Sequence, residues 1–193
     1  MLEHLDRLTV LLLNKIAVVK ISQIEAISRK DQNKSKVEIP DNLGWYFAGF
    51  VDGEGSFNVS LRRKSDYKVN WQPVLSFNVS QREKTVLQLM QKNFNCGIIK
   101  MRKDGLYSYD VTNPQAIKET IIPFFEKYGF FSTNKKKNFS IFRKIVELMV
   151  SKKHLEPAGF KTLLGLREKL NQGKGRERKY TMRNVLESSE TIR

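Results

Sequence analysis

The chain has 193 residues, enough for one domain with a substantial hydrophobic core, and it carries a formal net charge of +15 with a pI near 9.9. This excess of positive charge indicates a polyanionic partner. The single cysteine, Cys96, excludes an intrachain disulfide and a cysteine-based zinc site, and the two histidines lie too far apart in sequence to favour a histidine-built metal site.

The first 39 residues predict an N-terminal extension to a domain that spans residues 40–193. A helix is expected near Leu5–Ser28, followed by a polar linker at Arg29–Glu38. The apolar stretch Leu8–Val19 is too short to cross a membrane, and it has no basic segment before a cleavage site. We therefore expect no secretion signal and no membrane partner, so that the protein acts in the compartment where it is made.

Residues 47–55 predict a short apolar helix, called here the motif helix, which ends in an acid between two glycines. Asp41 is expected to be its N-cap. Gly49 and Gly53 lie four residues apart and therefore share one face, where no side chain keeps a partner backbone away. Glu54 falls beside unpaired carbonyls at the negative end of the helix dipole, where a carboxylate needs a cation. If two copies pack through their glycine faces, two acids and several carbonyls form an all-oxygen site suited to Mg²⁺.

Alternating apolar and polar residues predict two antiparallel hairpins after the motif helix. The expected strands are Ser56–Arg63, Gln72–Ser80, Ile98–Lys103 and Leu106–Thr112, the last two joined by a turn at Asp104 and Gly105. A capping box at residues 80–83 is expected to open a helix that runs through Phe94. Further helices are expected from Asn113 and Pro114 to about Tyr128, and at residues 134–150, 157–170 and 181–188.

This order of elements predicts an α+β fold, with a four-stranded antiparallel saddle-shaped sheet and helices on one face. No second apolar helix that ends in an acid occurs anywhere in the chain. Each chain is therefore expected to supply one half of a site, and the motif helix is expected to lie at the interface of a homodimer.

Residues 47–55 resemble the LAGLIDADG motif, with Phe47, Gly53 and Glu54 in place of its first Leu, second Ala and last Asp; Asp52 and Gly55 match it. A weaker resemblance extends from about residue 43 to the C-terminus, with landmarks at residues 79–81, 135–138 and 188–191. The chain is similar to the single-motif, homodimeric homing endonucleases encoded in introns.

The resemblance implies a divalent-metal-dependent endonuclease that cuts a long pseudo-palindromic DNA site and leaves short 3′ overhangs. It implies that Glu54 and the Gly53 carbonyl hold Mg²⁺, for which Mn²⁺ can substitute, and that Gln81 and Lys135 lie beside the metal and the attacking water. A basic residue that some members carry four positions after this glutamine is Thr85 here, which leaves Arg82 or Lys84 as its substitute. The dimer interface is expected to contain Phe47, Gly49, Phe50 and Gly53.

The polar faces of the strands are suited to contacts with base edges in double-stranded DNA. Basicity begins after the motif, with seventeen Lys and Arg against seven Asp and Glu in residues 56–150. Candidate base-contacting residues are Asn58, Ser60, Arg62, Lys64, Gln72, Ser76, Asn78, Lys100 and Arg102, with Asp110 opposite them. Candidate phosphate contacts are Lys136 in a lysine run at a helix start, and Lys174 and Arg178 in a basic segment near the C-terminus.

Two alternatives share the expected fold. One is a maturase that binds its intron RNA and assists splicing, and the other is a DNA-binding protein that has lost cleavage. The acid at Glu54 argues against the second alternative, because a protein that only binds DNA has no need for a pair of like charges. In each case the expected location is the bacterial cytoplasm or the interior of an organelle.

Overall fold

The computed structural model describes residues 39–190, except residue 68 and residues 173–177. The expected N-terminal extension and Lys174 lie outside the described residues. The first described helix is α2 (Asp41–Glu54), which matches the predicted motif helix and leads directly into the first strand. Within the described ranges no helix has the length and apolar character needed to cross a membrane.

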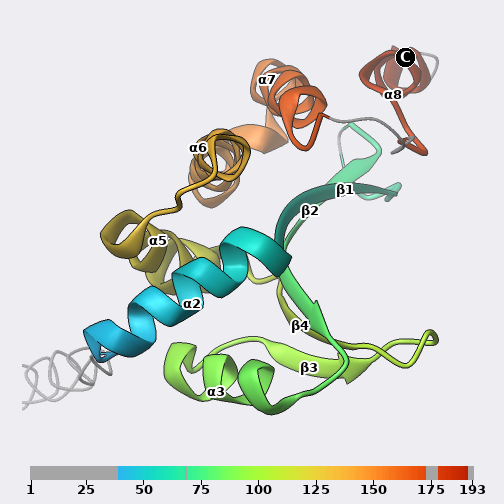
Figure 1. The fold of residues 1–193 in the computed structure, drawn as a ribbon. Coiled ribbons are helices and arrows are strands. Elements are labelled where there is room, and N and C mark those ends of the chain that lie inside the picture. Colours follow the sequence, from blue (N-terminus) through green and yellow to red (C-terminus); the bar gives the residue numbers. More distant parts are fainter. Residues whose placement is uncertain (1–38, 68, 173–177, 191–193) are drawn as a thin grey trace, which may run out of the picture. The chain divides into compact units, whose positions relative to one another are not determined.

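Four strands form one antiparallel sheet, as the alternation predicts. They are β1 (Gly55–Arg63), β2 (Trp71–Gln81), β3 (Ile98–Met101) and β4 (Tyr107–Val111). Their order across the sheet is β1-β2-β4-β3, so the two long strands form one half and the two short strands the other. Figure 1 shows the sheet curving, with both of its outer ends bent away from α2 and α5.

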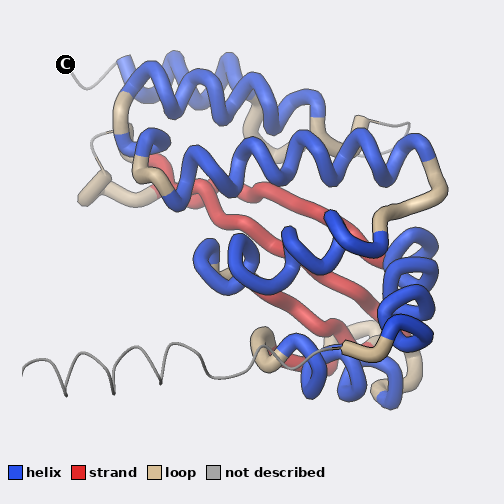
Figure 2. Tube along the Cα trace, turned by 90° about the vertical axis from the view of Figure 1, so that its left-hand side faces the viewer, coloured by secondary structure: helices blue, strands red, loops and turns tan. Residues whose placement is uncertain are grey.

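The helices gather on one side of this sheet (Figure 2). In chain order they are α3 (Thr85–Phe94), α4 (Pro114–Ala116), the π-helical segment η1 (Ile117–Ile121), α5 (Ile122–Tyr128), α6 (Thr133–Val150), the 3-10 turn η2 (Lys153–Leu155), α7 (Pro157–Lys169) and α8 (Met182–Glu190). The fold is therefore α+β, with one covered and one open sheet face.

The main core lies between the covered face of the sheet and helices α2, α3, α5 and α6. Burial alternates along β2, so that Leu75 and Phe77 are fully buried while the residues between them are half-buried. Phe57 on β1 lies at the centre, with its ring centroid 5.5 Å from that of Phe77 and 5.9 Å from that of Phe125. Truncation of such a buried phenylalanine to alanine costs about 3–5 kcal/mol.

A second, smaller core supports the far end of the β1–β2 hairpin. It contains Leu61, Trp71, Phe160, Leu164 and Val185, from β1, β2, α7 and α8. The buried side chain of Arg167 on α7 joins the same region, because its Nε donates to the Val59 carbonyl at 3.0 Å and its Nη1 to the Tyr180 carbonyl at 2.9 Å. Helices α7 and α8 therefore pack against the β1–β2 hairpin and stabilise it.

Two predicted helix starts are wrong. Pro40 is the N-cap of α2, and Asp41 is the first helical residue, with its carboxylate bound by the Lys127 amine at 2.8 Å and the Tyr128 hydroxyl at 2.9 Å. The capping box at residues 80–83 does not form, because β2 extends through Gln81 and pairs there with β4. Helix α3 begins later, at Thr85, without a side-chain cap.

Candidate functional site

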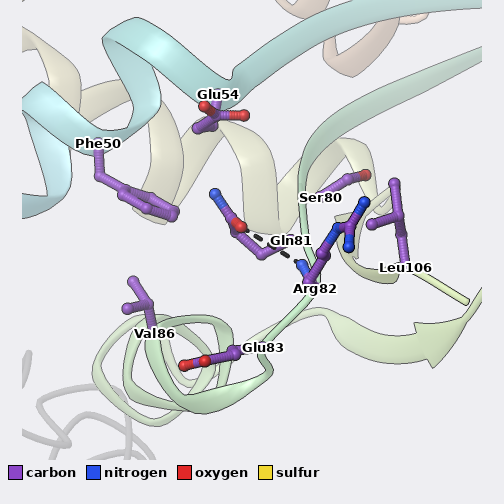
Figure 3. Close-up of a pocket in the computed structure, with 8 residues that line it drawn as sticks. All are labelled: Phe50, Glu54, Ser80, Gln81, Arg82, Glu83, Val86 and Leu106. Carbon is purple, nitrogen blue, oxygen red and sulfur yellow. Dashed lines mark hydrogen bonds between the residues drawn. The ribbon is translucent and has the colours of Figure 1, made fainter.

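Glu54 is the last residue of α2 and its side chain is exposed. The chain turns directly from helix to strand at Gly55, where a Cβ would lie 2.4 Å from Val51 Cγ1, so only glycine permits this close approach. As a result Glu54 lies over an open cavity of about 520 Å³ (Figure 3). The other residues that line this cavity are Phe50, Ser80, Gln81, Arg82, Glu83, Val86 and Leu106.

Gln81 enters the cavity from the end of β2. Its side chain is directed toward Glu54 and Phe50, and its Oε1 accepts the backbone N–H of Arg82 at 3.3 Å (Figure 3). Arg82 also lines the cavity, whereas the Lys84 amine lies 5.9 Å from the centre of the Tyr107 ring. Of the two cations that were candidates to substitute for a basic residue at Thr85, the structure therefore places Arg82, and not Lys84, among the residues that line the cavity.

Lys135 reaches the same region from the first turn of α6. Its amine donates a hydrogen bond to the Gly55 carbonyl, at the junction of α2 and β1. Burial lowers the pKa of Lys135, and the negative charges of Asp52 and Glu54 oppose that shift. The three sequence-predicted catalytic residues, Glu54, Gln81 and Lys135, thus surround the end of α2, although they come from three separate elements.

Asp52 is part of this region and was assigned no role from the sequence beyond its match to the motif. Its Oδ2 accepts the backbone N–H groups of Phe131 and Ser132, each at 2.9 Å, and its Oδ1 accepts the Ser132 hydroxyl. Partial burial opposes ionisation, but these hydrogen bonds and the charge of Lys135 outweigh it and hold the pKa of Asp52 below its usual value. Asp52 lies near the C-terminus of a helix, where a carboxylate is unfavourable unless it is bound by donors or cations. This position in the sequence could have indicated that Asp52 has binding partners.

The donor groups at the end of α2 suit a hard divalent cation, which prefers carboxylate and carbonyl oxygens. One protomer alone offers few such groups, because no three Asp, Glu, His or Cys side chains cluster in the part of the chain that the structure describes. A second copy of Glu54 and of the Gly53 carbonyl would complete an oxygen-rich set. The oxygen donors at the end of α2 therefore fit a hard divalent cation in their chemistry.

The exposed face of α2 is open where a second copy would pack. A Cβ placed on Gly49 or Gly53 would meet nothing within 4 Å. Trp45 and Tyr46 are 54% and 50% exposed, and Phe50 is half-buried. Phe47, in contrast, is 0% exposed, since it packs into the core against Phe94 and Phe124. Its expected place in the dimer interface is wrong, because it lies on the opposite side of the helix.

Antiparallel pairing brings the predicted base-contacting residues onto the open face of the sheet. The cross-strand partners on this face are Arg62 with Gln72, Ser60 with Val74, Asn58 with Ser76, Asn78 with Asp110, and Lys100 with Ser108. Arg102 lies in the turn just beyond β3 and reaches the face through a 3.4 Å contact between its Nη1 and Ser80 Oγ. The alternating pattern therefore predicted a real surface that crosses all four strands.

Several cations on this face are already paired within the protomer. Lys100 lies 2.6 Å from the buried carboxylate of Asp110, which also accepts the Ser108 hydroxyl at 3.0 Å. Arg102 lies 2.8 Å from Asp104, and Lys64 lies 3.1 Å from Asp66. These ion pairs partly neutralise the charge of Lys100, Arg102 and Lys64 within the protomer.

Of the candidate phosphate contacts, Lys136 is exposed near the start of α6. Arg178 is occupied within the chain, since its Nη2 donates to the Leu170 carbonyl and its Nε lies 3.7 Å from Glu168 Oε2. Arg178 therefore helps to attach the segment before α8 to the end of α7.

The family model for the LAGLIDADG endonuclease matches residues 47–146, which include the C-terminal part of α2, the whole sheet and most of α6. The chain belongs to this family. A probable intron-encoded endonuclease 2 of Neurospora crassa is 32% identical over 145 residues, which cover 73% of this chain and 32% of that protein. The DNA endonuclease I-CeuI of Chlamydomonas moewusii is 30% identical over 125 residues, 62% of this chain and 57% of that protein.

Solved structures of LAGLIDADG endonucleases share the fold. The archaeal intron-encoded homing endonuclease I-Vdi141I, complexed with DNA, superposes with a TM-score of 0.72 at 30% identity over 78% of this chain and 96% of that chain. The meganuclease I-SmaMI, bound to uncleavable DNA, gives a TM-score of 0.64 at 33% identity over 67% of this chain and 45% of that chain. Against the curated family members above, the chain spans about a third to somewhat over half of their length.

Proposed function

We propose that the chain is one protomer of a homodimeric, divalent-metal-dependent endonuclease that cuts double-stranded DNA. Its target would be a long pseudo-palindromic site, cut to leave short 3′ overhangs. The observation that carries this proposal is the exposed Glu54 carboxylate at the end of the family's motif helix, beside Gln81, the half-buried Lys135 and the open glycine face. The DNA bound by I-Vdi141I and I-SmaMI supports the choice of substrate class.

Each protein group has a role in phosphodiester hydrolysis. Glu54 and the Gly53 carbonyl of two protomers would hold Mg²⁺ or Mn²⁺ at the dimer axis. When bound, such an ion polarises the scissile phosphate and lowers the pKa of the attacking water. The Gln81 amide, directed toward Glu54, would orient that water by hydrogen bonds. The Lys135 ammonium would stabilise the negative charge that develops on the phosphate.

The open sheet face would lie along the major groove and bind base edges through its polar side chains. Because the dimer is symmetric, each half-site of about one helical turn would be read by one sheet, for a target of about 20 base pairs. We expect the protein to act where it is made, in the bacterial cytoplasm or inside an organelle.

Replacement of the acid separates binding from cutting. We expect Glu54→Gln to abolish cleavage while DNA affinity stays within a few fold, since the carboxylate binds metal and not bases. Glu126→Gln removes a carboxylate that pairs with Arg143 at 2.7 Å, far along the chain on α5, and serves as the control that cuts normally. Cleavage of a cognate duplex is measured with Mg²⁺ under single-turnover conditions, and binding is measured with Ca²⁺.

A Glu54→Gln protein that cuts at the normal rate would refute the assignment of the acid. Preference for a structured intron RNA over the duplex, with no cleavage by the unaltered chain, would instead support the maturase function.

A further inference from the structure

The segment that joins α5 to α6 is attached to α2 chiefly through one carboxylate. Phe130 in this segment is buried, but the side chain of the next residue, Phe131, is 87% exposed. The three hydrogen bonds to Asp52 cross 79 and 80 residues of sequence and fix Phe131 and Ser132 by their backbone amides. Apolar packing holds Phe130 in the core, whereas Phe131 and Ser132 are held by the Asp52 carboxylate.

Helix α6 begins in a way that is unfavourable by itself. Its first turn contains no acidic residue, and its N-cap, Ser132, makes no side-chain capping bond within the helix. The lysines at positions 135–137 place positive charge near the positive end of the helix dipole. Asp52 supplies from α2 what the start of α6 lacks, namely an anionic acceptor for the free amides at and before the N-cap.

Lys135 lies within one turn of this attachment point. Its amine is directed back to the Gly55 carbonyl, three residues beyond Asp52 at the opposite end of the same short junction. The two contacts together bind the start of α6 to the end of α2 on both sides of Glu54. A rotation or shift of α6 would therefore separate Lys135 from the acid.

We propose that Asp52 is a positioning residue for cleavage, which acts by fixing the start of α6 so that the Lys135 amine stays beside Glu54. This inference rests on the proposed function, because it assigns to Asp52 an effect that passes through Lys135. A residue that only stabilised the fold would affect cleavage independently of Lys135, and the two cases predict different results in a double-mutant cycle.

The cycle combines Asp52→Asn with Lys135→Ala and measures single-turnover cleavage at saturating DNA. Asn is nearly isosteric with Asp but keeps one acceptor oxygen in place of two and has no charge, so we expect cleavage to slow by about ten-fold or more through misplacement of the amine. In the Lys135→Ala background the same change is expected to slow cleavage less than two-fold. If Lys135→Ala leaves no measurable rate, Lys135→Arg, which keeps the cation, takes its place.

Asp41→Asn is the matched control. Asp41 is also a carboxylate on α2, with bonds to the Lys127 amine and the Tyr128 hydroxyl, but it lies at the other end of the helix. The Asp41→Asn substitution is expected to leave the cleavage rate unchanged. DNA affinity and the dimer dissociation constant are measured for every variant and are expected to stay within two-fold for Asp52→Asn. Should Asp52→Asn fail to fold, Ser132→Ala removes only the hydroxyl contact and is carried through the same cycle.

The outcomes distinguish the positioning role of Asp52 from the proposed endonuclease function. Independent effects of the Asp52 and Lys135 substitutions would overturn the positioning role of Asp52. If Glu54→Gln has also lost cleavage and Lys135→Ala cuts more slowly, the proposed endonuclease function still stands. Normal cleavage in Lys135→Ala would overturn the role of Lys135 and this inference with it. Normal cleavage in Glu54→Gln would overturn the proposed function itself.

Discussion

The glycines of α2 differ in their surroundings, and this difference predicts opposite effects of the same substitution. A Cβ on Gly44 would lie 2.1 Å from Cζ of Tyr128, inside the protomer, whereas a Cβ on Gly49 would meet nothing within 4 Å. Substitution of Gly44 by alanine is therefore a change to the core. Substitution of Gly49 is a change to a surface that is free in one protomer and covered in the proposed dimer.

The magnitudes follow from helix propensity and packing. In the isolated protomer, Gly49→Ala gains about 1 kcal/mol, because alanine favours the helix and no atom opposes its Cβ. Gly44→Ala has the same gain, but overpacking against Tyr128 costs about 1–3 kcal/mol, so no net stabilisation is expected. In a symmetric dimer each new Cβ occurs twice at the interface. If the two new Cβ atoms together weaken the binding free energy of the dimer by only about 1.4 kcal/mol, the dissociation constant of the dimer rises ten-fold.

The assay is sedimentation across a concentration series, combined with urea unfolding at a concentration low enough to populate the monomer. We expect Gly49→Ala to be more stable as a monomer and weaker as a dimer, and Gly49→Leu to be monomeric or insoluble at micromolar concentration. Both Gly49 variants should cut DNA more slowly, since the proposed site is built from two copies of Glu54. A Gly49→Leu protein that sediments and cuts like the unaltered chain would refute the glycine-face dimer.

Three further results are expected. Asn78→Ala and Arg102→Ala should relax base discrimination by roughly 1–3 kcal/mol at particular positions in both half-sites, measured by selection of cleavable targets; an asymmetric target would contradict the dimer. Lys136→Ala and Lys174→Ala should each weaken binding to all DNA sequences and reduce the slope of log affinity against log salt concentration by about 0.9. Arg178→Ala should have the same effect and should also lower the stability of the fold, because Arg178 binds the end of α7. The pKa of Asp52 is lower in the folded chain than its usual value of 3.8, so its ionised form adds stability above that value, and this contribution is lost as pH falls through the folded pKa. The difference in unfolding free energy between the unaltered chain and Asp52→Asn should thus be constant from neutral pH to about pH 5 and shrink as the pH falls further; a difference that does not depend on pH would contradict the assigned hydrogen bonds.

Local patterns in the sequence predicted most of the fold. Period-two alternation located both hairpins within a few residues, because one sheet face is buried and the other is not. Asn113 caps the helix that follows it, as expected, by accepting the N–H groups of Gln115 and Ala116. The π-helical turn at Ile117–Ile121 was not predicted; it lies just before Pro123, which has no N–H to continue a regular ladder.

The errors arose where a distant segment decides the outcome. The first two residues of the supposed capping box, Ser80 and Gln81, pair with β4, which lies more than twenty residues further along the chain. Apolar periodicity placed Phe47 and Phe50 on one helix without distinguishing the core side from the interface side. The role of Asp52 depends on amides 79 and 80 residues away, so no local pattern could have revealed its partners.

The main core lies under β1, β2 and β4, whereas the second core supports only the β1–β2 half of the sheet. The β1–β2 half has eleven-residue and nine-residue strands and is braced by α7, α8 and the buried Arg167. The β3–β4 half ends in a four-residue edge strand on which Ile98 and Met101 are 61% and 69% exposed. A lineage whose target site drifts by mutation would therefore meet unequal constraints. We expect adaptive substitutions to accumulate first at the exposed positions of β3, such as Ile98 and Met101, because β4 itself contributes the buried Tyr109 and Val111 to the main core.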